Sequence, residues 1–268
     1  MSEISLLRFL LSRYNRWSLV ALALMVALYV TIPFVWNDLA RQNLHVVNWF
    51  LIAIWVFMSA LLCWDVRPAQ DIALAAVALA GGAMFEGWGT NTGLWWYFTG
   101  EKPPLWILPA WPVAALATAR IVFAFDQVLI RWKLPWRALY WFFAAVFALG
   151  MARFIRPSVM MWPTWLMCGA LAAVIATGRS PRRDVSLLLA GMALGYFLEY
   201  WGTSRACWTY YTREIPPLVT VMAHGYGQVL FARTLDATDW GFKKLGASWT
   251  VKARDASDPM TEQSSPPL

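Results

Sequence analysis

Glu86 and Glu199 are the residues whose type and surroundings best suit chemistry, because each stands near the end of an apolar run. They lie 113 residues apart (199 − 86 = 113), and the segments that begin with them match without a gap at Glu, Trp, Gly, Thr, Trp, Tyr, Thr, Glu, Pro, Pro and Leu. An ionisable group in an apolar span is costly, so function is the default hypothesis. In the alternative, each carboxylate only caps loop amides or a Trp indole. If the glutamates meet, charge repulsion and desolvation keep a proton on one of them, as a general acid requires.

Aromatic and hydroxyl residues follow both glutamates at matching positions. The candidate substrate-binding residues are Trp88, Thr90, Trp95 and Tyr97 in the first copy and Trp201, Thr203, Trp208 and Tyr210 in the second. Trp and Tyr collect at every membrane interface, so an interfacial belt explains them without a ligand. Alternatively, they line a cleft for a flat or polyunsaturated lipid, where the ring faces stabilise a carbocation. That second interpretation suits isoprenoid chemistry.

His224 is the third candidate catalytic residue. It has no counterpart in the first copy, since Trp111 occupies the matching position (224 − 113 = 111). A histidine inside an apolar span either transfers protons near Glu199 or packs as a hydrogen-bonded residue.

Two further acid and base pairs follow the same offset. Asp71 matches Asp184, and Arg120 matches Arg233. Each arginine lies about fifteen residues into the next antiparallel helix, or roughly 22 Å along it, so it can meet the aspartate at the inner end. We predict structural ion pairs that join neighbouring helices.

The composition favours a polytopic membrane protein. Of the 268 residues 60% are hydrophobic and 14% charged, with a mean hydropathy of +0.50. The net charge of +7 comes from basic residues between apolar spans, so no nucleic-acid partner is predicted. The three cysteines do not recur across the repeat and suggest packing. Because carboxylate-rich and His-rich clusters and nucleotide-binding motifs are missing, the sequence predicts no metal and no cofactor.

The apolar runs predict an all-α protein with about eight transmembrane helices, arranged as two tandem four-helix parallel repeats. The expected spans are 17–36, 45–64, 72–88, 104–125, 136–155, 158–177, 185–201 and 218–235. We expect a basic cytoplasmic lead-in at 1–16, repeat one at 17–130, repeat two at 131–235 and a disordered cytoplasmic tail at 236–268. Pro109 and Pro112 are expected to interrupt the fourth span, and Gly225 and Gly227 to weaken the eighth.

The distribution of Lys and Arg predicts the orientation. Most of these residues lie on one side if both termini are cytoplasmic, as expected in a bacterial-type inner (plasma) membrane. An even number of spans per repeat then relates the halves by an axis along the membrane normal. Both aromatic loops would emerge on the non-cytoplasmic face.

The first aromatic segment resembles the carotenoid-biosynthesis membrane proteins that include the bacterioruberin-pathway hydratases. The matching residues are Glu86, Gly89, Thr92-Gly93, Tyr97, Thr99 and the Pro-rich stretch from Pro103 to Pro112. The resemblance covers about forty residues of each repeat, and in the second Arg205-Ala206 replaces Thr92-Gly93. The chain departs from the family in its Trp content and clear duplication.

The resemblance implies acid-catalysed addition of water to an isoprenoid double bond. Glu86 or Glu199 would protonate the alkene, aromatic faces would stabilise the cation, and a carboxylate base would deliver water. Such a reaction would need no redox cofactor.

Two alternatives stay open beside this enzyme. The absence of an unambiguous catalytic constellation favours a pigment- or lipid-binding subunit of a membrane complex. Parallel repeats and interrupted helices favour a small transporter. The expected partner in the first two cases is a membrane lipid or an isoprenoid.

Overall fold

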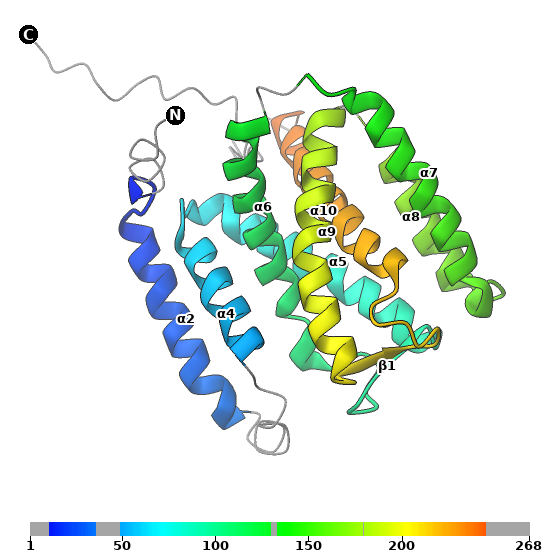
Figure 1. The fold of residues 1–268 in the computed structure, drawn as a ribbon. Coiled ribbons are helices and arrows are strands. Elements are labelled where there is room, and N and C mark those ends of the chain that lie inside the picture. The colour runs from blue at the N-terminus through cyan, green and yellow to red at the C-terminus, as the bar shows by residue number, and fades with distance from the viewer. Residues whose placement is uncertain (1–10, 36–48, 130–132, 179, 245–268) are drawn as a thin grey trace, which may run out of the picture.

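The computed structural model describes residues 11–35, 49–129, 133–178 and 180–244 (Figure 1). Within them the chain is mostly helical. Four helices are long and apolar enough to cross a membrane, judged by length and composition: Pro68–Asn91, Leu105–Phe123, Trp136–Phe154 and Pro181–Ser204. Shorter apolar helices cover Arg16–Thr31, Ile52–Cys63 and Trp162–Ala176. The fold therefore indicates a helical membrane protein.

The repeat seen in the sequence recurs in the boundaries of the secondary structure. Helix α4 (Trp49–Cys63) matches α8 (Trp162–Ala176), and α5 (Pro68–Asn91) matches α9 (Pro181–Ser204). The starts differ by 162 − 49 = 113 and 181 − 68 = 113 residues, and each pair has equal length. Both long helices begin with a proline at the first position, where its missing N–H is not needed.

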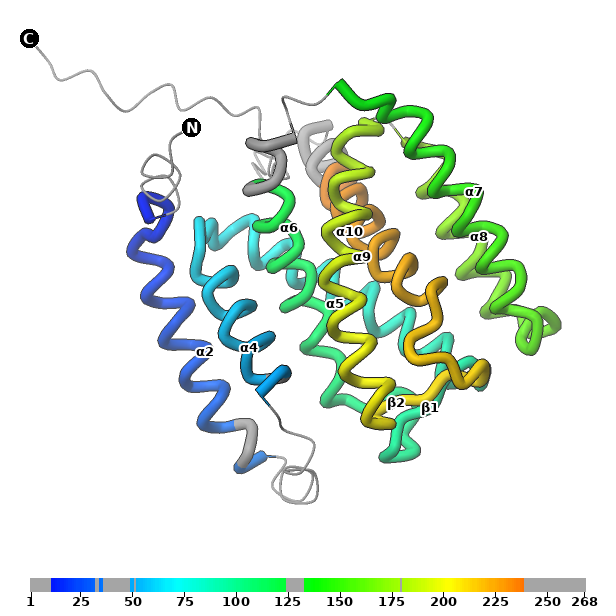
Figure 2. The backbone as a smooth tube through the Cα atoms, viewed as in Figure 1, coloured from blue at the N-terminus to red at the C-terminus, as the bar shows by residue number. Residues whose placement is uncertain are grey.

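The first helix of each half breaks this correspondence. Helix α2 (Arg16–Val35) and α7 (Trp136–Phe154) start 136 − 16 = 120 residues apart. Helix α2 packs against α4, whereas α7 packs against α9 and against α10 (Leu218–Lys244). Figure 2 shows α2 and α4 on one side of the molecule and α7 and α8 on the other.

Helices α5, α6 (Ala110–Leu129), α9 and α10 form the centre of the fold (Figure 1). Each half contributes one pair, and the pairs meet where α6 contacts α9 and α10 contacts α5. Small residues allow α9 and α10, the pair from the second half, to approach each other closely. A Cβ on Gly225 would lie 2.5 Å from the carbonyl oxygen of Leu188, and one on Gly191 would lie 2.9 Å from the Gly225 Cα. The G-x-x-x-G spacing of α9 thus serves helix packing.

Three boundary predictions need correction. Helix α10 runs unbroken through Gly225 and Gly227, and Gly225 serves close packing, since a Cβ there would meet Leu188. It also continues to Lys244, so residues 236–244 of the expected tail are helical; the rest of that tail lies outside the described residues, as does most of the lead-in. Helix α6 begins after Pro109 and holds Pro112 in its first turn, where proline is tolerated.

Two short strands join the halves at one end of the fold. Strand β1 (Trp95–Tyr97) pairs antiparallel with β2 (Trp208–Tyr210). Trp95 lies opposite Tyr210, and Tyr97 opposite Trp208. Because the offset of 113 also maps Trp95 onto Trp208 and Tyr97 onto Tyr210, a two-fold rotation between Trp96 and Thr209 exchanges the strands. The two aromatic loops therefore lie side by side.

Both expected ion pairs are present at the other end of the central helices. Arg120 Nη2 lies 2.7 Å from Asp71 Oδ2, and Arg233 Nη2 lies 2.7 Å from Asp184 Oδ2. Arg120 is 1% exposed and also donates to the Trp64 and Leu116 carbonyls. These bonds satisfy a guanidinium that would otherwise be costly to bury.

Candidate ligand site between two glutamate clusters

The first cluster forms around Glu86, which is 5% exposed near the end of α5. Its Oε2 accepts hydrogen bonds from the Tyr97 hydroxyl at 2.8 Å and from Trp95 Nε1 at 3.1 Å. Its Oε1 accepts from Trp111 Nε1 at 3.1 Å. Side chains alternate along a strand, so Trp95 and Tyr97 both face inward while Trp96 is exposed. Each oxygen of this carboxylate therefore has a neutral donor.

The second cluster repeats this arrangement around Glu199, which is 3% exposed on α9. Trp208 Nε1 donates to Oε2 at 2.9 Å, and the Tyr210 hydroxyl donates to Oε1 at 2.8 Å. The third contact differs, because His224 Nε2 lies 2.8 Å from Oε1. The histidine occupies the place that an indole occupies in the first cluster.

Glycines make room for the rings of both clusters. A Cβ on Gly89 would lie 1.8 Å from the Trp95 ring, and one on Gly202 would lie 2.0 Å from the Trp208 ring. Neither glycine can carry a side chain unless its indole moves away from the glutamate. The repeated Trp-Gly-Thr motif thus encodes a flat surface on the helix against which an indole lies.

The two clusters touch through the residues in which they differ. The Trp111 and His224 rings stack with centroids 5.3 Å apart and planes at 14°. Gly82 lies beneath Trp111, and Gly195 beneath His224. A chain of contacts thus runs from Glu86 through the two stacked rings to Glu199.

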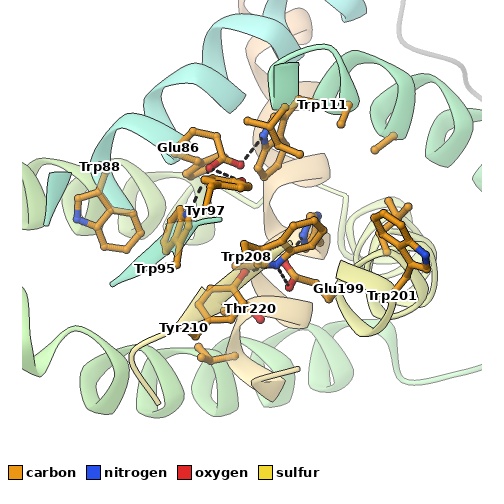
Figure 3. A pocket seen from close by; sticks show the side chains of 18 of the residues that line it. Glu86, Trp88, Trp95, Tyr97, Trp111, Glu199, Trp201, Trp208, Tyr210 and Thr220 are labelled. Atoms are coloured by element: carbon orange, nitrogen blue, oxygen red, sulfur yellow. Dashed lines mark hydrogen bonds and ion pairs between the residues drawn. The ribbon is translucent and has the colours of Figure 1, made fainter. Parts of the chain in front are cut away.

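Both clusters line one cavity of about 250 Å³, whose wall is almost entirely apolar (Figure 3). Residues from both halves of the chain line this cavity. Among those predicted from the sequence, it contains Glu86, Trp88, Trp95, Tyr97, Glu199, Trp201, Trp208, Tyr210 and His224. Figure 3 shows the two glutamates on opposite sides, with Trp201 beyond Glu199.

Thr90 and Thr203, also predicted as substrate-binding residues, are not among the residues that line this cavity. The hydroxyl of Thr90 donates to the Glu86 carbonyl and that of Thr203 to the Glu199 carbonyl, each at 2.6 Å. The reason is that α5 and α9 extend beyond both threonines, so each hydroxyl bonds the preceding turn of its own helix. These residues shape the helix ends.

Several lining residues were not chosen from the sequence. The most consequential is Trp111, which binds Glu86 and stacks on His224. The repeat offset pointed to it, since Trp111 matches His224. The other additions include Trp55, Trp106, Phe154 and Thr220. They come from apolar runs in which lining residues look like lipid-facing ones.

Tyr97 and Tyr210 keep their hydroxyl protons and so remain hydrogen-bond donors to the glutamates. Burial, followed by the charge of Glu86, raises the pKa of Tyr97 well above its ordinary value of 10.0. Burial and then the charge of Glu199 do the same to the pKa of Tyr210. Both hydroxyls therefore stay protonated through the physiological range.

Across the described residues, no group of three or more His, Cys, Asp and Glu side chains is arranged to hold a metal ion. Comparison with protein-family models, with curated proteins and with solved structures finds no match for this chain. The proposal below therefore rests on the geometry of the site.

Proposed function

We propose that this protein is an eight-span membrane protein that binds a neutral hydrophobic lipid, such as an isoprenoid, between its two halves. Counting α2, α4, α8 and α10 with the four long apolar helices gives eight spans. The Lys and Arg distribution then favours cytoplasmic termini. The matching helix boundaries support two tandem four-helix repeats, and the paired strands support aromatic loops on one face.

The observation that carries the proposal is the cavity itself. It is about 250 Å³ in volume and is walled by aromatic and aliphatic side chains, with few polar groups. Ligand sites have this composition, with a small number of polar groups that fix orientation. The two carboxylates are already bonded by neighbouring side chains, so the pocket does not call for a cationic ligand.

Ligand extraction tests the proposal. The full chain would be purified in mild detergent, washed, extracted with organic solvent and analysed by mass spectrometry. We expect a neutral lipid in stoichiometric amount that is depleted in a Trp88→Ala, Trp201→Ala variant, whose cavity walls are cut back. A control variant, Trp49→Ala, changes a tryptophan outside the cavity that is 84% exposed. Recovery of only bulk lipids, in equal amounts from all three proteins, would refute the proposal.

A second function, hydration of an isoprenoid alkene, is favoured by one observation. His224 and Glu199 form a proton-exchanging pair in the cavity wall, with the ring and carboxylate 2.8 Å apart. Glu86 is a poorer candidate for the acid, because its third partner is the Trp111 indole, which cannot exchange a proton, where Glu199 has His224. In this mechanism the pair gives a proton to one alkene carbon, water adds its oxygen to the other, and the proton lost by that water returns to the pair.

Isotope labelling tests the hydration. An acyclic polyene incubated with the protein in water enriched in oxygen-18 should give a labelled tertiary alcohol. We expect Glu199→Gln to lower its formation about 100-fold or more, the usual scale for an acid or base. Unlabelled or absent product with folded wild-type protein would exclude the reaction and leave the binding function.

The transporter alternative loses part of its support. It relied on interrupted fourth and eighth helices. The fourth span does change at Pro109, from a 3-10 turn at Leu105–Ile107 to α6, but α10 is continuous over its described length.

A further inference from the structure

His224 presents a polar atom that the two clusters do not use. Its Nε2 faces Glu199 Oε1, so this nitrogen carries a hydrogen when Glu199 is ionised. Within the described part of the chain, Nδ1 has no hydrogen-bond partner. The side chain is 18% exposed, compared with 4% for Glu199. The free edge of the ring is therefore accessible where the carboxylate is not.

The other polar groups of the wall are occupied or covered. Glu86 accepts three hydrogen bonds, and Glu199 accepts two and shares a third with His224 Nε2. Trp88 Nε1 donates to Thr164 at 3.1 Å. The Thr220 hydroxyl donates to the Pro217 carbonyl. Trp106 and Trp201 have indole N–H groups without a partner, but protein atoms cover them completely. His224 Nδ1 is thus the polar atom most available to a ligand.

The wall of the cavity also shows where the rest of a ligand could lie. Trp55 of α4 lines the cavity and is 47% exposed, and Ala110 at the start of α6 is exposed as well. Neighbouring α4 side chains, Val56 and Phe57, are 64% and 54% exposed and apolar. In a bilayer this rim would face acyl chains. The rim of the cavity thus includes exposed residues of α4 and of α6.

The volume agrees with partial enclosure. Pockets that bury a drug-sized ligand enclose about 300–1,000 Å³, which exceeds the 250 Å³ found here. The cavity suits the end of a longer lipid whose chain leaves past Trp55. A single hydrogen-bonding contact then decides which end enters.

We propose that the site binds a neutral single-chain lipid by an oxygen-bearing end, a hydroxyl or a carbonyl, whose oxygen hydrogen-bonds Nδ1 of His224. This inference rests on the lipid-binding function proposed above and adds the chemical class of the ligand. A hydroxyl donates to Nδ1 of the neutral ring, and a carbonyl accepts from Nδ1–H of the charged ring. A hydrocarbon end makes neither bond.

Three probes with one isoprenoid skeleton test this: farnesol, farnesal and farnesene, which end in a hydroxyl, an aldehyde and a hydrocarbon. Their binding to the purified full chain in detergent would be measured by calorimetry. We expect farnesol or farnesal to bind about three- to tenfold more tightly than farnesene, the scale of one net hydrogen bond. Comparing farnesol with farnesal separates the hydroxyl from the carbonyl.

Two variants locate the contact. His224→Phe keeps a flat ring against Trp111 and should reduce the preference to less than twofold while farnesene still binds. His224→Gln keeps a polar side chain and should retain part of the preference if the phenylalanine variant does not fold. Trp201→Phe, the control, should weaken all three probes alike.

The outcomes separate this inference from the proposed function. Equal affinity of the three probes for the wild type would overturn the oxygen contact and leave lipid binding standing. An unchanged preference in folded His224→Phe would also overturn it. Failure of every probe to bind folded wild-type protein would refute the proposed function, and the oxygen contact with it.

Discussion

The imidazole of His224 lies parallel to the indole of Trp111, with ring centroids 5.3 Å apart, although the two residues occupy equivalent positions of the repeat. Each ring is also bonded to the glutamate of its own half. The stack therefore couples two clusters through their unlike members, since an indole does not titrate and an imidazole does.

Glu86→Gln should lower the free energy of unfolding by about 1–3 kcal/mol, because the amide nitrogen would face a donor that now has no acceptor. Thermal unfolding of the purified protein, followed by circular dichroism, measures this. Glu101→Gln, a change at an exposed glutamate after the first aromatic strand, is the control and should have no effect. A Glu86→Gln variant as stable as the wild type would mean that the carboxylate does not hold the cluster together.

Gly89→Ala should destabilise the protein by roughly 1–3 kcal/mol, since the new methyl group overlaps the Trp95 ring. Gly87→Ala is a matched control in the same helix, where a Cβ meets nothing within 4 Å. The control should stabilise by up to about 1 kcal/mol through helix propensity. Equal melting temperatures for the two variants would contradict the close packing of the indole.

Arg120→Met should cost about 3–5 kcal/mol, because it leaves Asp71 at a largely buried position without its cationic partner. Arg183→Met is the comparison. Its ion pair with Asp236 has side chains 29% and 43% exposed, so its loss should cost about 1 kcal/mol or less. Similar unfolding free energies for both variants would show that the Arg120 pair does not stabilise the helix pair.

Alkaline pH should weaken the fold through Tyr97 and Tyr210. Their pKa values are raised by burial, so the stability they contribute is complete below the ordinary value of 10.0 and is lost as pH rises above it. Unfolding measured between pH 9 and 11 should become steadily easier, and less so in the Tyr97→Phe, Tyr210→Phe variant. Tyr200→Phe, which removes a hydroxyl from a 45% exposed ring, should leave the pH dependence as it is. The same pH dependence of unfolding in the wild type and in both variants would rule out the two buried tyrosines as its source.

The two aromatic loops should report the same side of the membrane, because their strands pair directly. A cysteine introduced at Phe98 and one at Arg213, in separate variants lacking the three native cysteines, should react alike with a membrane-impermeant thiol reagent added from outside intact cells. Labelling of one position from outside and of the other only after lysis would contradict the pairing and the parallel arrangement of the halves.

The offset between the two copies of the repeat predicted which residues form the two clusters better than it predicted the role of each residue. A single offset located Glu86, Trp95 and Tyr97 together with their counterparts, because a strand and a helix end repeat as one unit. The two threonines lie outside the lining of the cavity, because their helices run one turn further than the apolar pattern suggests. A bond between a hydroxyl and its own helix leaves no periodic signal in the sequence.

Gly225 was misjudged for a related reason. Local propensity treats glycine as a helix breaker, yet Gly225 lets two helices approach. Trp111 escaped selection because its neighbours in the sequence are as apolar as lipid-facing residues. Only the packing of α6 against the rest of the fold shows that its indole turns inward.

The two-fold register of β1 and β2 has an evolutionary consequence. In a dimer of identical units, any residue on the rotation axis would face its own copy, and every mutation would appear twice. Here Trp96 faces Thr209, and Trp111 faces His224. Joining both copies in one polypeptide lets a mutation occur in one copy alone. A symmetric scaffold can then acquire a single histidine beside one of its two glutamates.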